Sequence, residues 1–139
     1  MAANEVFSVA KMDFTRAGDV SARIKRMLKL LGVDARVIRR IAVATYEAEI
    51  NLVIHSEGGE IVLQIEPRDI VITVRDVGPG IADIDQAMTE GFSTASEDAR
   101  SMGFGAGMGL PNMSRNADRF AIQSKLGVGT TIVMAFDLE

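Results

Sequence analysis

The sequence predicts an α+β domain, a two-layer sandwich in which a mixed, mostly antiparallel sheet is covered on one face by about three helices. Two pairs of alternating apolar and polar segments, each pair joined by a short turn, are typical of β-hairpins. Three further segments carry apolar residues at helical spacing, which suits helices that cover one sheet face. With 139 residues, 47% of them hydrophobic, the chain fits one domain over residues 1–139.

The first elements expected are a strand and a helix. Residues 6–14 mix β-branched, aromatic and polar side chains, which favours a strand. Residues 16–31 have helical apolar spacing, and either Thr15 or Asp19 can cap the start of this helix. Gly32 follows it, where a left-handed residue commonly ends a helix.

A second helix and a hairpin come next. Asp34 is the expected N-cap of a longer helix that reaches about residue 55. Residues 60–66 and 70–75 both alternate, and the turn at residues 67–69 joins them into a hairpin.

The remainder contains a long connection, a helix and a second hairpin. Residues 76–109 are polar, small and rich in glycine, and connections of roughly thirty residues are usually functional or disordered. A helix over residues 110–117 follows. Strands over residues 119–124 and 130–138 flank a turn at residues 125–129.

Composition excludes several classes of function. The absence of cysteine excludes disulfides and thiolate metal sites, and one histidine leaves no histidine cluster for a metal. A net charge of -4 argues against a nucleic-acid footprint. No apolar run is long enough to span a membrane, and the N-terminus lacks a signal pattern, so we expect a cytoplasmic protein.

Three motifs contain residues that suit ligand binding or catalysis. The first is Asp76 at the end of an expected strand, followed by Gly78, Gly80 and Ile81. A carboxylate there can accept a hydrogen bond from an exocyclic amine, and glycines let a flat ring approach the backbone. A plain β-turn explains the same residues.

The second motif is a run of four glycines in residues 103–109, directly before the helix that begins near Leu110. Backbone N–H groups of such a loop, joined to a helix N-terminus, suit a polyphosphate. The run is neither a dinucleotide-binding fingerprint nor a P-loop, because it follows no strand and ends in no Gly-Lys-Ser/Thr. A flexible hinge is the alternative.

The third motif is Glu47 and Asn51, which are one turn apart on the second helix. Asn51 interrupts an apolar stretch, and its amide oxygen suits Mg²⁺. Glu47 can take a proton from a hydroxyl or water. Taken alone, the pair is better explained by an exposed Glu47 and an Asn51 satisfied by a loop backbone.

In this order and spacing, the three motifs resemble the GHKL ATPase superfamily, which includes gyrase, one class of chaperone, histidine kinases and mismatch-repair proteins. Within it, the chain is most similar to bacterial anti-sigma-factor serine kinases and stressosome switch kinases. The run 107–113, Arg119-Phe120 and the turn 127–131 carry that likeness. The resemblance implies the Bergerat ATP-binding fold, with an ATP lid at about residues 82–104.

The resemblance also implies roles for individual residues. Asn51 would coordinate Mg²⁺ and Glu47 would act as the base. Asp76 would recognise the adenine amino group, with Gly78, Gly80 and Ile81 beside it and Thr130 acting through a water. The phosphates would be wrapped by the second glycine motif, which consists of Gly105, Ala106, Gly107, Met108, Gly109 and Leu110.

Two features depart from the family pattern. Glu49 is a second acid where the relatives carry apolar or small residues, and we assign it no catalytic role. No lysine lies near the expected phosphates, and Arg100 and Arg115 are the nearby cations.

The resemblance therefore predicts an ATP- and Mg²⁺-dependent protein serine/threonine kinase that acts on a STAS-type anti-anti-sigma partner. It also implies binding of a sigma factor and a homodimer. A non-catalytic, ATP-responsive binding module is the alternative. The catalytic half of a histidine kinase ranks below both, because the only histidine, His55, lies in the helix of the third motif.

Overall fold

The computed structural model describes residues 3–10, 16–56, 58–78, 80–81, 84, 88 and 109–138. The elements in chain order are β1 (Ala3–Val9), α1 (Asp19–Leu30), α2 (Ala35–His55), β2 (Gly59–Ile65), β3 (Asp69–Asp76), α5 (Gly109–Asn116), β4 (Arg119–Lys125) and β5 (Gly129–Asp137). The expected lid, at about residues 82–104, lies outside the described residues except for Ile84 and Met88, where the Met88 N–H donates to the Ile84 carbonyl at 2.9 Å.

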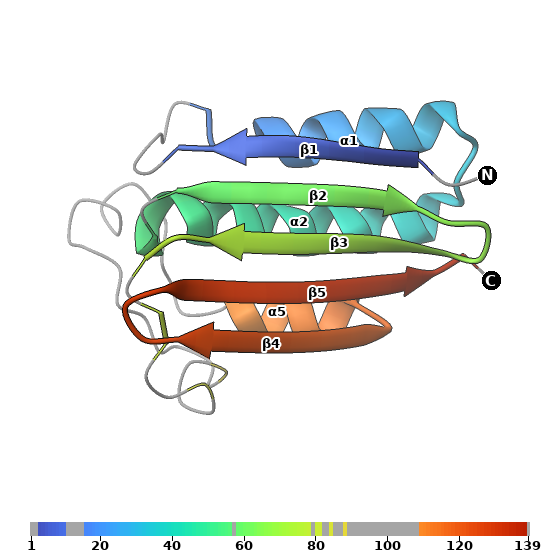
Figure 1. Ribbon diagram of the computed structural model, residues 1–139. Helices are drawn as coiled ribbons and strands as arrows, with labels where there is room; N and C mark the ends of the chain where they lie inside the picture. Colours follow the sequence, from blue (N-terminus) through green and yellow to red (C-terminus); the bar gives the residue numbers. More distant parts are fainter. Residues whose placement is uncertain are drawn as a thin grey trace.

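The five strands form one sheet in the order β1-β2-β3-β5-β4 (Figure 1). All four strand pairings are antiparallel. The two expected hairpins are present as β2–β3 and β4–β5, and β5 lies between β3 and β4. The predicted α+β sandwich with an antiparallel sheet is therefore confirmed.

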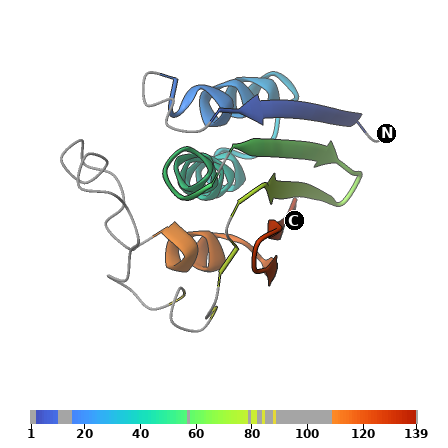
Figure 2. The ribbon, with the colours of Figure 1, turned by 60° about the vertical axis from the view of Figure 1, so that its left-hand side comes forward.

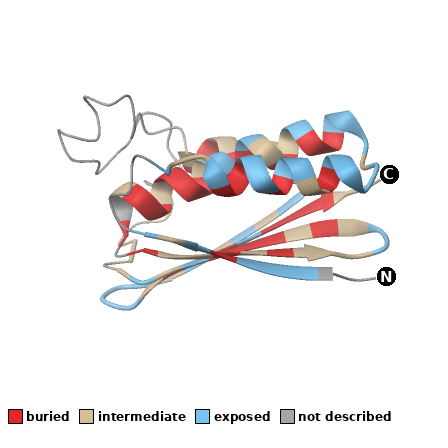
Figure 3. Ribbon diagram, turned by 90° about the horizontal axis from the view of Figure 1, so that it is seen from above, coloured by how far each residue is buried: buried red, intermediate tan, exposed pale blue. Residues whose placement is uncertain are grey.

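The helices of the described residues cover one face of the sheet, with α2 between α1 and α5 (Figures 1 and 2). Seen edge-on, the chain has two layers, and its buried residues lie between them (Figure 3). The core consists of apolar side chains from both layers, among them Ile24, Leu28, Ile41, Leu52, Ile61, Leu63, Ile72, Met113, Met134 and Phe136.

Strand β1 differs from its predicted bounds. It begins at Ala3 and ends at Val9, whereas the strand was expected to continue to residue 14. The register explains the end, since Val9 pairs with Gly59, the first residue of β2. Residues 11–14 of the expected strand lie outside the described residues.

The helix ends are partly as predicted. Gly32 has a φ of 78°, so the left-handed residue after α1 is confirmed. The Asp34 side chain accepts from the Arg36 N–H at 2.8 Å, so its role as N-cap of α2 is confirmed. The expected cap of α1 is wrong for Asp19, because the N-cap is Gly18, which provides no side-chain hydrogen bond. Thr15 lies outside the described residues.

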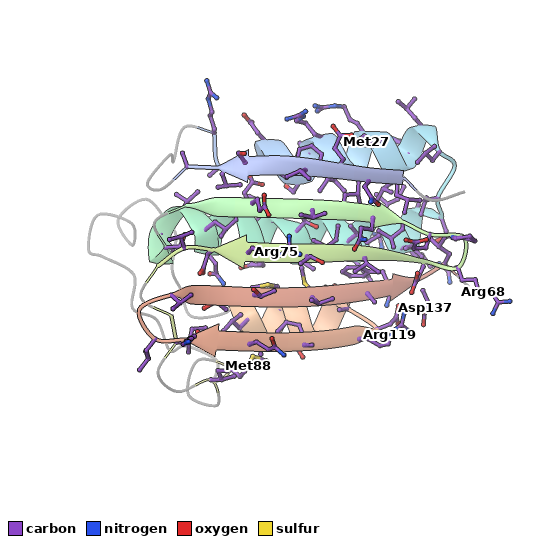
Figure 4. All side chains as sticks on the ribbon, in the orientation of Figure 1. Met27, Arg68, Arg75, Met88, Arg119 and Asp137 are labelled. Atoms are coloured by element: carbon purple, nitrogen blue, oxygen red, sulfur yellow. The ribbon has the colours of Figure 1, made fainter. Side chains whose placement is uncertain are left out.

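The layers are arranged so that several chain ends meet. One end of the molecule, on the left in Figure 1, holds the first turns of α1 and α5 and the last residues of α2 and β3. The β4–β5 turn lies at the same end. Arg119 and Asp137 mark the opposite end (Figure 4). No helix in the described part of the chain is long and apolar enough to cross a membrane.

Candidate nucleotide-binding site

The end of α2 and the start of α5 bring three of the predicted site residues together. A Cβ placed on Gly109 would lie 3.0 Å from Asn51 Oδ1 and 3.4 Å from Glu47 Oε2. A side chain at residue 109 would therefore meet both polar groups and would crowd the Asn51 amide. Glu47 and Asn51 are half-buried on the same face of α2.

Helix α5 begins at Gly109, where the predicted phosphate-binding loop ends. Pro111 lies in the first turn, where a helix tolerates proline because those N–H groups have no partner within the helix. Leu110 is 8% exposed and belongs to the core, so it anchors the helix start. The N-terminus of α5 is thus fixed beside Glu47 and Asn51, and a helix N-terminus favours anions.

Asn112 is a neighbour of Glu47 to which the sequence analysis gave no role. Its side-chain Nδ2 donates to Glu47 Oε1 at 3.3 Å. Its Oδ1 accepts from Arg115 at 2.8 Å. The one sequence signal was its place in the run 107–113, which carries the likeness to switch kinases.

Asp76, the last residue of β3, is half-buried at the same end of the sheet. Its Oδ1 accepts from the Thr130 N–H at 2.6 Å. Burial raises the pKa of Asp76, and the Thr130 N–H opposes that rise. Within the described residues no hydrogen bond is recorded to Oδ2, so this oxygen can accept from a ligand.

Gly129 is a residue of this site that the sequence analysis missed. Its φ is 149°, and a Cβ there would lie 2.3 Å from the Asp76 carbonyl oxygen. Gly129 therefore lets β5 lie close enough for the Thr130 N–H to reach Asp76.

The first glycine motif packs against the β4–β5 turn. The Gly78 N–H donates to the Val128 carbonyl at 3.3 Å. Gly80 has a φ of 74°, and a Cβ there would lie 2.5 Å from the Lys125 carbonyl oxygen. This residue must therefore be glycine both for its backbone conformation and for its contact.

Ser124 connects the motif to Thr130 and was also missed. Its Oγ accepts from the Ile81 N–H at 2.6 Å and lies 2.9 Å from Thr130 Oγ1. Ile81 and Thr130, which are far apart in the sequence, therefore share one hydrogen-bonded group. A hydroxyl near the end of a strand carries no sequence signal for such a role.

Gly59 joins the two halves of the site. It pairs with Asp76 across the β2–β3 ladder. A Cβ on Gly59 would lie 3.0 Å from Leu52 of α2 and 2.1 Å from the Arg75 carbonyl oxygen. The helix that carries Asn51 is thus packed directly on the strand end that carries Asp76.

Glu49 has a structural role that the sequence did not reveal. It is 2% exposed, and its two carboxylate oxygens accept from the Val20 and Ser21 N–H groups, each at 3.1 Å. It therefore caps α1 from α2, in place of the expected Asp19. Burial raises the pKa of Glu49, the backbone N–H bonds oppose this rise, and the nearby Asp19 charge adds to it.

Tyr46 makes a second contact between these helices. A Cβ on Gly18, the residue before α1, would lie 3.3 Å from the Tyr46 ring. Glu49 and Tyr46 thus hold the start of α1 against the part of α2 that carries Glu47.

Some predicted residues lie outside the described part of the chain. These are Gly105, Ala106, Gly107 and Met108 of the second glycine motif, together with Arg100. His55 is the last residue of α2.

The described residues fit Mg·ATP. Asp76 offers an acceptor for an amine, Asn51 offers a hard oxygen, and the space beside Gly109 is one that a Cβ would fill. No group of three or more His, Asp or Glu side chains that could hold a metal ion is found among the described residues. An Mg²⁺ ion here would therefore take most of its ligands from phosphates and water, as is usual for this ion.

Comparison with known proteins agrees with this geometry. Residues 36–139 match the family described as histidine kinase-, DNA gyrase B-, and HSP90-like ATPase. The chain is 34% identical to the serine/threonine-protein kinase RsbT of Bacillus subtilis over 78% of each chain. It is 33% identical to the anti-sigma F factor of Clostridium acetobutylicum, over 68% of this chain and 66% of that one.

The anti-sigma F factor of Pasteuria penetrans is 32% identical over 93% of this chain and 90% of its own. The matched family region contains α2 from its second residue, α5 and all strands except β1, and hence Glu47, Asn51, Asp76 and Gly109. The chain therefore belongs to the histidine kinase-, DNA gyrase B- and HSP90-like (GHKL) ATPase family, and within it resembles the anti-sigma kinases.

Proposed function

We propose that this chain is an ATP-dependent protein serine/threonine kinase of the anti-sigma-factor type, which phosphorylates a Ser or Thr on a STAS-type antagonist protein. One observation carries the proposal. Gly109, at the start of α5, lies so close to Glu47 and Asn51 that a Cβ on it would meet both side chains. A base, a metal ligand and an anion-binding helix end thus share one place. The kinase RsbT, at 34% identity, supports this reaction class.

Bound Mg·ATP supplies the γ-phosphoryl group and the charge neutralisation that its transfer needs. Asn51 Oδ1 would be the protein ligand of Mg²⁺, and the N–H groups at the α5 N-terminus would bind the phosphates. Glu47 accepts the proton of the attacking hydroxyl as the new O–P bond forms and ADP leaves. Holding these groups at one place is the main catalytic contribution of the chain.

The base end of the nucleotide lies at Asp76 in this proposal. Asp76 Oδ2 accepts from the adenine amino group, and Thr130 acts through a water. Gly78, Gly80 and Ile81 border the ring. The second glycine motif, from Gly105 through Ala106, Gly107 and Met108 to Gly109 and Leu110, would bind the phosphates.

The test is transfer of radiolabel from γ-labelled ATP to proteins captured by the full-length chain. We expect labelled Ser or Thr on a captured protein, and loss of the label with Glu47→Ala while nucleotide still binds. Asn51→Ala should reduce the Mg²⁺-dependent part of ATP binding. If Glu47→Ala labels the partner at the wild-type rate, Glu47 is not the base.

The similarity to two anti-sigma F factors favours a second candidate, an ATP-responsive binding module that sequesters a sigma factor or another regulator. In this case ATP changes the affinity for the partner, and Glu47→Ala has no effect on regulation. Partner affinity measured with ATP, with ADP and without nucleotide, for wild type and Glu47→Ala, separates the two candidates.

The uncovered face of the sheet is the surface that we assign to a second copy of the chain. One register row across all five strands carries small or apolar side chains, namely Val6, Val62, Thr73, Val133 and Ala121. Among these, Val6 is 59% and Val133 37% exposed, and no described helix covers this face (Figure 3). Exposed apolar rows of this kind mark association surfaces.

The homodimer is tested by light scattering of the purified chain. We expect a dimer, and a monomer after Val133→Lys, because a buried unpaired ammonium opposes association. Lys at the exposed position Leu30, on the helical side, is the matched control. A monomeric wild-type chain at all accessible concentrations contradicts the dimer. A cytoplasmic location belongs to the same proposal, because sigma factors act inside the cell.

A further inference from the structure

Glu47 is held by a side chain from another helix. Asn112 of α5 donates from Nδ2 to Glu47 Oε1 at 3.3 Å, although the two residues are 65 positions apart. The other oxygen, Oε2, lies 3.4 Å from the Cβ position of Gly109, on the side of Asn51. The two carboxylate oxygens of Glu47 therefore have different surroundings.

Chemistry determines the orientation of the Asn112 amide. The guanidinium of Arg115 can only donate hydrogen bonds, and its Nη2 lies 2.8 Å from Asn112 Oδ1. An ionised carboxylate only accepts, so the amide NH2 group must face Glu47. Flipping the amide would place its NH2 against the guanidinium and its oxygen against the carboxylate, and both contacts would be repulsive.

We propose that Asn112 is a positioning residue for Glu47, and that Arg115 sets the orientation of its amide. This inference rests on the proposed role of Glu47 as the base. With Oε1 bonded to Asn112, the carboxylate cannot rotate freely. Oε2 stays directed toward Gly109 and Asn51, where the attacking oxygen must arrive. The Arg115–Asn112–Glu47 chain thus links an exposed arginine of α5 to the base.

The first experiment detects the contact itself, independently of activity. We expect Glu47→Gln to shift the side-chain ¹H–¹⁵N signals of Asn112 in the full chain, because a hydrogen bond to an anion is replaced. The control is Asn116, whose Nδ2 donates to the Asn112 backbone carbonyl at 2.8 Å and which should shift little. Unchanged Asn112 signals overturn the inference, even if the chain has no kinase activity.

The second experiment measures turnover of Mg·ATP at saturating nucleotide. Asn112→Leu, which has nearly the same size, should lower kcat about 10- to 100-fold, because the base loses its orientation. The nucleotide Kd should stay within about twofold, because this interaction serves the transition state. Asn116→Leu, on the same helix, should retain wild-type kcat.

Two further variants separate positioning from a structural role. Asn112→Asp keeps the acceptor for Arg115 but replaces the donor, so kcat should fall at least as far as with Asn112→Leu. If Asn112 only holds Arg115 in place, Asn112→Asp keeps wild-type kcat, and the inference is wrong. In a Glu47→Gln background, Asn112→Leu should have no further effect on kcat.

Absence of turnover and of partner labelling in the wild-type chain counts against the proposed kinase, whereas the spectral test still decides the Asn112 contact. Wild-type turnover with an unaffected Asn112→Leu variant counts against Asn112 alone.

Discussion

Strand β3 begins and ends with an aspartate, and the two ends differ. Asp69 pairs with Arg119 at 2.8 Å, and Arg119 also pairs with Asp137 at 2.8 Å. Asp76, at the other end, accepts from a backbone N–H group. A third ion pair, Arg40–Asp118 at 3.0 Å, lies at the same end as Asp69 and joins α2 to the segment before β4.

At the Asp76 end, Glu60 pairs with Arg75 at 3.3 Å, but the carboxylates of Asp76, Glu47 and Glu49 have neutral partners. Glu47 accepts from an amide, and Glu49 accepts from two backbone N–H groups. No ion pair of these acids is recorded among the described residues. Neutral donors orient a carboxylate without neutralising it. Asp76 and Glu47 thus remain able to bind an amine or a proton, whereas Glu49 and the ion pairs at the opposite end join strands and helices.

The largest expected effect is that of Asp76→Asn on nucleotide binding. The Thr130 N–H bond can persist, but the charged acceptor for the adenine amine is lost. We expect ATP affinity to fall about 100-fold by calorimetry, the scale of a hydrogen bond to a charged group. Asp69→Asn, at the other end of the same strand, is the control and should bind ATP normally. Equal losses for both variants would remove the distinction between the two ends.

The next largest expected effect is the loss of stability caused by Glu49→Ala. It leaves two buried N–H groups at the start of α1 without an acceptor, so the free energy of unfolding should fall by about 3 kcal/mol in urea titrations. Glu49→Gln keeps one acceptor oxygen and should lose less. A loss for Glu49→Ala no greater than that for Glu49→Gln would show that the cap is not needed.

The two ends should also respond oppositely to pH. The pKa of Glu49 is raised by burial, so its contribution to stability is present below its ordinary pKa of 4.5 and is lost as pH rises through the raised value. The pKa of Asp118 is lowered by its hydrogen bond to Arg40, so its contribution is present above 3.8 and is lost as pH falls. Glu49→Gln should therefore remove the decline above pH 4.5, and Asp118→Asn the decline at acid pH, in urea titrations across pH.

Gly80→Ala tests the contact between the first glycine motif and the β4–β5 turn. Gly80 and Gly32 have φ values of 74° and 78°, but only Gly80 has a backbone atom in the path of a Cβ. Both variants pay the left-handed strain, about 1 kcal/mol. Gly80→Ala should lose about 2 kcal/mol more, and should also weaken ATP binding. Equal losses would mean that the turn moves aside without strain.

Arg119→Gln should have the smallest effect. Both of its ion pairs are exposed, and exposed pairs contribute little and are screened by salt. We expect a thermal midpoint close to that of wild type, with the difference shrinking as salt is added, and unchanged ATP affinity. A marked loss of ATP affinity would show that the far end affects the nucleotide site.

The sequence predicted well what depends on local patterns. The hairpins, Gly32 after α1 and the Asp34 cap follow from residues within a few positions of each other. The placement of Glu47 and Asn51 on one helix face is equally local. The resemblance of the three motifs to the family then predicted that they form one site.

What the sequence did not predict depends on tertiary contacts. Glu49 caps a helix that begins 30 positions earlier, and this contact cannot be predicted from the spacing between Glu49 and Glu47. The Asn112–Glu47 bond and the Ser124–Ile81 bond join elements that meet only in the folded sheet. The end of β1 at Val9 is determined by its partner strand and not by its own composition.

The packing of Tyr46 against Gly18 has a practical consequence. The chain has no tryptophan and one tyrosine, so the fluorescence excited beyond the absorption of its six phenylalanines comes from a single ring. That ring lies at the start of α1, one residue before Glu47. The protein thus carries its own optical reporter, without a label or a substitution, for any movement of α1 relative to the helix that bears the proposed base.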